Sequence, residues 1–140
     1  MVMKTLVVRL DSLGDVLLAG PALRAVAAGS DHVTMLVGPR GEAAARMLPG
    51  VSRLITWHCP WIDAEPADVD GDEVNRLIET VATGSFDKAV ILTSFHQSAL
   101  PTALLLRLAG VRSITAISED YAGALLDTRV APDWSLHEVD

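Results

Sequence analysis

Apolar residues along the chain fall into two alternating kinds of segment. Short, nearly continuous apolar runs, such as TLVVRL and KAVILT, are typical of strands that are covered on both faces. Between them, apolar positions recur with the spacing of one helix face. The predicted strands cover residues 5–10, 32–37, 53–57, 88–93, 113–117 and 125–130, and the predicted helices cover 16–28, 42–48, 72–83 and 98–109.

Glycine and proline residues mark where these segments end. Pro21 lies inside the first helical stretch, where it predicts either a kink or a true first turn that follows a tighter turn. Gly29, Gly84 and Gly110 each follow an apolar periodic stretch and are expected to close a helix.

The alternation of strands and helices predicts an α/β protein with a Rossmann-like, three-layer α/β/α architecture around a mostly parallel sheet. The right-handed crossovers of such a sheet bring the loops that follow the strands to one edge, where ligands bind. The pattern leaves the strand order open. A length of 140 residues, half of them hydrophobic, suits one domain over residues 1–140.

Charge and cysteine content exclude several classes of function. The net charge is −7 and the 11 basic residues are scattered, so we expect no nucleic-acid partner. Cys59 is the only cysteine, which excludes an intrachain disulfide and favours a reducing, cytoplasmic setting. No apolar run approaches the roughly 20 residues of a membrane-spanning helix. Lys4 and Arg9 interrupt the first apolar run, which is therefore interpreted as a strand rather than a signal peptide.

Two segments lie outside the regular pattern. An acidic stretch between Cys59 and Glu73 is interpreted as a solvated surface loop, with a mobile flap over a site as the alternative. The last residues, 134–140, are either a frayed tail or the start of a further helix.

The turn LDSLGDV after the first strand is the first candidate site. In a parallel sheet it lies at the carboxyl end of a strand, where backbone N–H groups and the helix dipole face a ligand. Gly14 permits close approach of a ligand or a positive φ. Asp15 then places a carboxylate beside the ligand, or it merely caps the helix. Neither the dinucleotide glycine fingerprint nor a Walker motif is present, which disfavours a nicotinamide cofactor or an ATPase.

The segment LTSFHQSALP after the fourth strand is the second candidate. Thr93, Ser94, His96 and Gln97 bring together hydrogen-bonding groups of the kind that bind sugars. The alternative is that Ser94 or Ser98 caps the next helix while His96 packs against a neighbour. The four histidines and Cys59 lack the spacing of zinc ligands, so no metal site is expected.

The first turn and its surroundings resemble the N-terminal segment of glycosyltransferase family 9, the ADP-heptose:lipopolysaccharide heptosyltransferase family. The resemblance lies in Arg9 at the strand end, Ser12 in the turn, the pair Gly14-Asp15, and Pro21-Ala22-Leu23 in the helix. It continues more loosely through LVGPRGEAAARMLPGVSRLI, through FDKAVILTSFHQSALPTALLLRLAGV and to the final HEVD.

This resemblance implies the N-terminal, acceptor-binding half of an inverting GT-B type glycosyltransferase, with Asp15 as general base. The donor-binding domain, which would bind a nucleotide-sugar such as ADP-heptose, is not represented in this sequence, so the chain alone should not turn over. The acceptor would be a glycan or glycolipid, as in lipopolysaccharide biosynthesis. Association with the cytoplasmic membrane would be peripheral at most, and no cofactor is expected beyond the donor. The expected acceptor-binding residues are Ser12, Gly14, Thr93, Ser94, His96 and Gln97.

Two other interpretations stay open. The chain could be a free-standing Rossmann-like module that binds a ligand or a partner without catalysis, in which case Asp15 is only a cap. An intact phosphate-binding enzyme of flavodoxin-like size is the third, and the missing glycine-rich loop disfavours it.

Overall fold

A computed structural model describes residues 2–94 and 96–131. Six parallel strands form one sheet in the order β3-β2-β1-β4-β5-β6. The strands are β1 (Lys4–Arg9), β2 (His32–Val37), β3 (Arg53–Thr56), β4 (Lys88–Ile91), β5 (Ser113–Ile117) and β6 (Thr128–Val130). The helices are α1 (Leu13–Leu18), α2 (Gly20–Ala28), α3 (Glu42–Met47), α4 (Gly71–Gly84) and α5 (Leu100–Leu108), with 3-10 turns η1 (Pro39–Gly41) and η2 (Gly123–Leu125).

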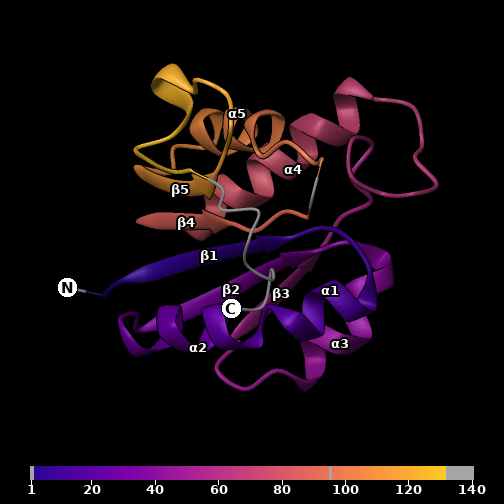
Figure 1. The fold of residues 1–140 in the computed structure, drawn as a ribbon. Coiled ribbons are helices and arrows are strands. Elements are labelled where there is room, and N and C mark those ends of the chain that lie inside the picture. The colour runs from indigo at the N-terminus through magenta and orange to yellow at the C-terminus, as the bar shows by residue number, and fades with distance from the viewer. Residues whose placement is uncertain (1, 95, 132–140) are drawn as a thin grey trace.

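Helices cover both faces of the sheet, which confirms the predicted three-layer α/β/α fold. Helices α1, α2 and α3 lie on one face, and α4 and α5 lie on the other (Figure 1). The chain first builds the sheet outward from β1 to β3 and then returns to add β4 on the other side of β1. With right-handed crossovers, this reversal places the helices of the two halves on opposite faces.

The central position of β1 in the sheet explains its continuous apolar run at residues 6–8. Leu6 and Val8 point into the core beneath α4 and α5, whereas Val7 packs with Leu23 and Val33 on the opposite face. All of these side chains are almost completely buried. A strand with no solvent-facing side cannot show the alternation of a half-exposed strand.

Several predicted boundaries differ from the structure. The predicted sixth strand begins only at Thr128, because its first residue, Leu125, is the last residue of η2 and Leu126 caps that turn. Pro21 separates two helices and lies in the first turn of α2, so the predicted single helix is wrong and its first-turn alternative is correct. The segment 134–140 lies outside the described residues. None of the described helices is long and apolar enough to cross a membrane.

The predicted stop at Gly84 is also displaced. Gly84 is the last residue of α4, and Ser85 takes the left-handed conformation that ends it, with φ of 51°. A Cβ atom on Gly84 would lie 2.4 Å from Cε2 of Phe86. Glycine at this position therefore makes room for the Phe86 ring rather than for an unusual backbone angle.

Gly41 makes a second close contact, between η1 and α1. A Cβ atom there would lie 2.4 Å from Cγ2 of Val16, which is completely buried. Gly41→Ala should therefore lower the free energy of unfolding by about 1–3 kcal/mol, the usual cost of overpacking. Urea denaturation measures this. Gly71→Ala is the matched control, because its Cβ would meet no atom within 4 Å. Equal stability of the two variants would contradict the proposed contact.

Candidate functional site

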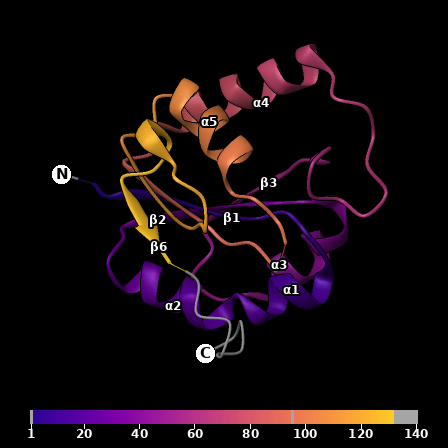
Figure 2. The ribbon, with the colours of Figure 1, turned by 45° about the horizontal axis from the view of Figure 1, so that its top comes forward.

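Both candidate segments follow strands at the point where the strand order reverses. β1 and β4 are neighbours in the sheet, but the chain leaves β1 toward α1 on one face and leaves β4 toward α5 on the other. In open α/β sheets the two diverging segments leave a crevice, which is the usual ligand site. Figure 2 shows that the segments after β1 and β2, and the long segment before α4, lie toward the same end of the sheet.

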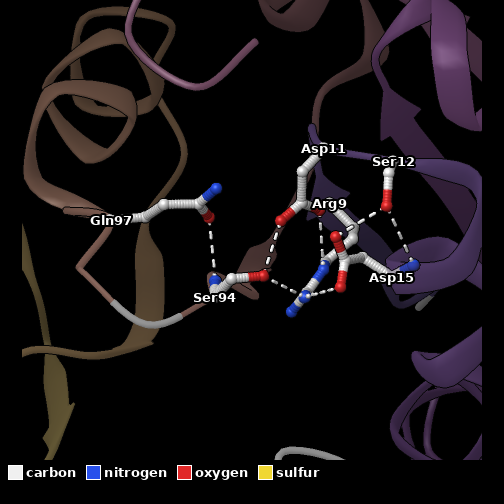
Figure 3. Close-up of polar contacts among 6 residues, drawn as sticks. All are labelled: Arg9, Asp11, Ser12, Asp15, Ser94 and Gln97. Carbon is white, nitrogen blue, oxygen red and sulfur yellow. Dashed lines mark hydrogen bonds and ion pairs between the residues drawn. The ribbon is translucent and has the colours of Figure 1, made fainter. Parts of the chain in front are cut away.

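The Arg9 side chain joins the two segments. Its Nε donates to Asp11 Oδ1 at 2.9 Å, and its Nη2 donates to Ser94 Oγ at 2.7 Å (Figure 3). The same Nη2 lies 3.3 Å from Asp15 Oδ1 in an ion pair. Ser94 Oγ in turn donates to Asp11 Oδ2 at 2.7 Å. One nearly buried guanidinium, only 7% exposed, is thus bound by two carboxylates and one hydroxyl.

Asp15 is the carboxylate of this network that a ligand can reach. Its side chain is 28% exposed, whereas that of Asp11 is 10% exposed. Ser12 Oγ donates to Asp15 Oδ2 at 2.8 Å, and Arg9 pairs with the other oxygen. A carboxylate oxygen can accept more than one hydrogen bond, so both retain capacity for a ligand.

The interpretation of Asp15 as the helix cap is wrong. Ser12 is the N-cap of α1, and its Oγ accepts from the backbone N–H of Asp15 at 3.4 Å. Asp15 is the third residue of the helix, and its carboxylate contacts the side chains of Ser12 and Arg9. Its acidic charge still suits the first turn, where the helix dipole favours it.

Gly14 lies in the first turn of α1 without a positive φ, which excludes one of the two reasons predicted for glycine there. A Cβ atom at this position would meet nothing within 4 Å. Packing within the described chain therefore does not require glycine here. Close approach by another molecule is the remaining explanation.

The segment after β4 is held by its own hydrogen bonds. The Ser94 backbone N–H donates to Gln97 Oε1 at 2.8 Å, and the Gln97 backbone N–H donates to the Ser94 carbonyl at 3.2 Å. Ser98 Oγ accepts from the Leu100 N–H at the start of α5, but the N-cap of α5 is Ala99, so neither Ser94 nor Ser98 is the N-cap residue. His96 is exposed rather than packed in the interior, and its φ of 64° is left-handed.

The structure thus brings together Ser12, Asp15, Ser94 and Gln97. It adds Arg9 and Asp11, which the sequence did not predict as site residues. Thr93 and His96 lie on the same segment as Ser94 but are not part of the network in Figure 3. Arg9 ends an apolar strand, and that is the signal that could have selected it. A charged residue buried in a strand must have partners.

A second polar cluster anchors the beginning of the acidic segment. Asp63 is buried, and its Oδ1 accepts from Arg40 Nε at 3.2 Å and from the Glu65 backbone N–H at 2.9 Å. His58 Nε2 lies 3.4 Å from Asp63 Oδ2. The Glu65 N–H and then the Arg40 guanidinium hold the pKa of Asp63 below its ordinary value. The prediction of a solvated loop is therefore wrong at Asp63 and correct for the exposed residues 64–70.

The aromatic residues beside this segment belong to the core rather than to a pocket. Trp57 and Trp61 stack edge to face with centroids 5.4 Å apart, and Trp61 Nε1 donates to Thr102 Oγ1 of α5 at 3.0 Å. Between them, Cys59 is fully buried, and burial raises the pKa of its thiol to about 12. Within residues 2–94 and 96–131, no three His, Cys, Asp or Glu side chains are grouped as metal ligands.

Three solved structures that are similar to this chain are glycosyltransferases. The chain is similar to E. coli ADP-heptose lps heptosyltransferase II, with a TM-score of 0.72 and 18% identity over 95% of this chain and 36% of that one. It is similar to a glycosyl transferase family 9 structure from Veillonella parvula, with a TM-score of 0.74 and 18% identity over 98% and 38% of the two chains. For E. coli heptosyltransferase WaaC with ADP, the TM-score is 0.68 and the identity 17% over 98% and 44%.

The described residues therefore have a Rossmann-like α/β fold that matches one part of each of these glycosyltransferases. More particularly, the fold is that of the glycosyltransferase family 9 heptosyltransferases, as the resemblance implied. The chain spans well under half the length of each of these neighbours. No protein-family model and no curated protein matches the sequence.

The Asp63 cluster predicts how stability depends on pH. Because its folded pKa lies below the unfolded value of about 3.9, Asp63 stabilises the fold above that pH, and the contribution is lost as pH falls through the folded pKa. Asp63→Asn should therefore lower the free energy of unfolding at pH 7 by about 1–3 kcal/mol. The difference from the unsubstituted protein should shrink as the pH falls below about 4, near the unfolded pKa, and on through the lower folded pKa. Urea denaturation across this range measures both quantities.

Asp68→Asn is the control for this experiment, since Asp68 is exposed in the same segment. It should leave stability nearly unchanged at every pH. A pH-independent loss in Asp63→Asn would show that the charge of Asp63 is not what anchors the segment.

Proposed function

We propose that this chain is the acceptor-binding domain of an inverting glycosyltransferase in which Asp15 is the general base. The observation that supports this most directly is the Asp15 carboxylate itself. It is partly exposed at the strand reversal and is oriented by Arg9 on one oxygen and by Ser12 on the other. In this proposal residues 1–140 form the N-terminal domain, and a second domain outside this chain binds the nucleotide-sugar.

The proposed reaction needs one proton acceptor from the acceptor-binding domain. The acceptor hydroxyl oxygen forms a bond to the anomeric carbon of the donor sugar while Asp15 takes its proton. The bond from the anomeric carbon to the diphosphate oxygen breaks, and the nucleoside diphosphate leaves with that electron pair. Attack opposite the leaving group inverts the configuration of the anomeric carbon.

The other residues of the site would position Asp15 and the acceptor. Arg9 and Ser12 fix the direction of the carboxylate, because each binds a different oxygen. Gln97 uses its carbonyl oxygen on the Ser94 N–H, which leaves its amide nitrogen available to an acceptor hydroxyl. We assign acceptor contacts to Ser12, Gly14, Thr93, Ser94, His96 and Gln97.

The substrates follow from the same proposal. Two of the neighbours carry ADP-heptose or ADP in their descriptions, so an ADP-sugar is the donor to test first. The acceptor is a glycan or glycolipid, with lipopolysaccharide core as the first candidate. The sugar would be transferred to this acceptor in the cytoplasm, and the enzyme would have at most peripheral contact with the inner face of the membrane.

Replacement of Asp15 tests the base. In the complete protein, Asp15→Asn keeps the shape of the side chain but cannot accept the proton. The kcat for sugar transfer should fall by about 10²–10⁴, with little change in the KM of either substrate. Steady-state kinetics with an ADP-sugar donor measures this.

Asp72→Asn is the matched control, because Asp72 is also an acidic residue in the first turn of a helix, here α4. It should retain full activity. A kcat within a few-fold of the unsubstituted protein for Asp15→Asn would contradict the assignment of the base. If the unsubstituted complete protein bound a glycan but transferred no sugar, the non-catalytic binding module would be the better interpretation.

Substitution of Gly14 tests whether the acceptor approaches the first turn of α1. Gly14→Ala should raise the free energy of unfolding by up to about 1 kcal/mol, because alanine favours the helix and its Cβ meets no atom of the chain. It should also raise the acceptor KM several-fold, since the added methyl group occupies the space of the ligand. Gly71→Ala, equally unobstructed at the start of α4, should change stability alone. An unchanged acceptor KM for Gly14→Ala would exclude close approach at this turn.

A further inference from the structure

A cavity of about 350 Å³ lies at the opposite edge of the sheet from Arg9. It opens at the amino ends of β1, β2 and β3, beneath the last turns of α4. Its volume falls within the range of small-molecule sites. The floor of the cavity carries the polar side chains of Lys4, His32, Thr34 and Arg53.

Strand register places these four side chains on one face. Lys4 is opposite His32, and Thr34 is opposite Arg53, in the parallel ladders of β1, β2 and β3. Because side chains alternate along a strand, His32 and Thr34 share the face of Leu36, which packs in the core under α4 and α5. Further along the same face, towards the carboxyl ends, the strands carry apolar residues. These four polar side chains are therefore confined to the amino ends of the strands.

Two buried atoms on this floor have no hydrogen-bond partner among the described residues. They are Oγ1 of Thr34 and Nδ1 of His32. Thr34 is 1% exposed. Buried polar atoms are almost always hydrogen-bonded, because leaving them unpaired in the interior is costly. A valine would fill the position of Thr34 without that cost, so packing alone does not account for the threonine.

The cavity is also basic in a chain whose net charge is −7. Lys4 Nζ lies 5.9 Å from the centroid of the Phe86 ring, and no ion pair is found for Lys4 or Arg53 among the described residues. The nearby carboxylates of Asp31 and Asp87 accept backbone N–H groups, those of Met3 and Lys4 respectively. These two carboxylates keep their negative charge, but they are not among the residues that line the cavity, whose Lys4 and Arg53 carry positive charge.

We infer that this cavity binds a small molecule that carries a phosphate or carboxylate group. The oxyanion lies between Lys4 and Arg53, and Thr34 and His32 complete their hydrogen bonds with its oxygen atoms. Arginine and lysine provide charge-assisted bonds to such groups. The cavity is separated from the Asp15 site by the length of the strands, so this inference is independent of the proposed glycosyl transfer.

The experiment is a titration of the complete, isotopically labelled protein at constant ionic strength. The probes are inorganic phosphate, glycerol 3-phosphate and acetate, and the readout is the amide resonances of residues 32–34 and 53. Saturable shifts confined to this edge are expected with at least one probe. The probe that binds most tightly distinguishes a phosphate ester from a carboxylate as the natural group.

Three variants make the result specific. Arg53→Gln should weaken binding about tenfold, since it removes one charge-assisted bond. Thr34→Val should also weaken binding, and it should raise Tm without ligand, because it removes an unpaired buried hydroxyl. Arg112→Gln is the matched control: it removes an exposed charge just before β5, outside the cavity, and should bind like the unsubstituted protein.

Several outcomes would overturn the inference. Absence of saturable shifts at residues 32–34 and 53 with all three probes is one of them. Equal weakening in Arg53→Gln and Arg112→Gln would show general screening of charge rather than a site. Unchanged binding in Thr34→Val would show that the anion stays outside the cavity.

Discussion

The candidate site depends on the hydrogen bonds and ion pairs of the buried Arg9 guanidinium. Arg9 ends the central strand, where an apolar residue would be expected from the rest of β1, and it cannot stay buried without partners. Those partners come from both sides of the strand reversal: Asp11 and Asp15 after β1, and Ser94 after β4. Removing one member of such a network leaves an uncompensated charge, which is more costly than the net worth of the bond. The two segments therefore stay together, because their separation would leave the buried Arg9 charge without its partners.

Rigid packing around this network makes its geometry reproducible. A Cβ on Gly38 would lie 2.7 Å from the Leu10 carbonyl oxygen, and one on Gly41 would overlap Val16. The segments after β1 and β2 therefore touch backbone to backbone, which fixes α1 and with it Asp15. Gly14 shows the opposite environment, with open space where its side chain would be. Gly38 and Gly41 therefore lie where a side chain would collide with the chain, and Gly14 lies where it would not.

The sequence was sufficient to predict the architecture, and the structure places the two candidate segments after neighbouring strands, whereas their role as a site stays a prediction. Strands β2 and β5 have the predicted bounds, because each is a run of β-branched and apolar residues bounded by glycine, proline or polar residues. The sequence did not predict which side chains would form hydrogen bonds with one another. The bond from Arg9 to Ser94 joins residues 85 positions apart, and only the strand order brings them together. Asp63 was misjudged for the same reason, since its partner Arg40 lies in another loop and composition treats every acidic residue in a run alike.

The charge balance of the site argues for a division of labour in the proposed transfer. The one basic side chain of the network in Figure 3, Arg9, is already neutralised by Asp11 and Asp15, which leaves the network with an excess of negative charge. Such a site suits the removal of a proton from a hydroxyl, but it would repel a departing diphosphate. The stabilisation of that leaving group requires cations or helix dipoles. The basic cavity at the amino ends of β1, β2 and β3 cannot supply them, because it opens at the other edge of the sheet. The positive charge for the leaving group must therefore come from a part of the protein beyond this network, as a two-domain transferase would provide.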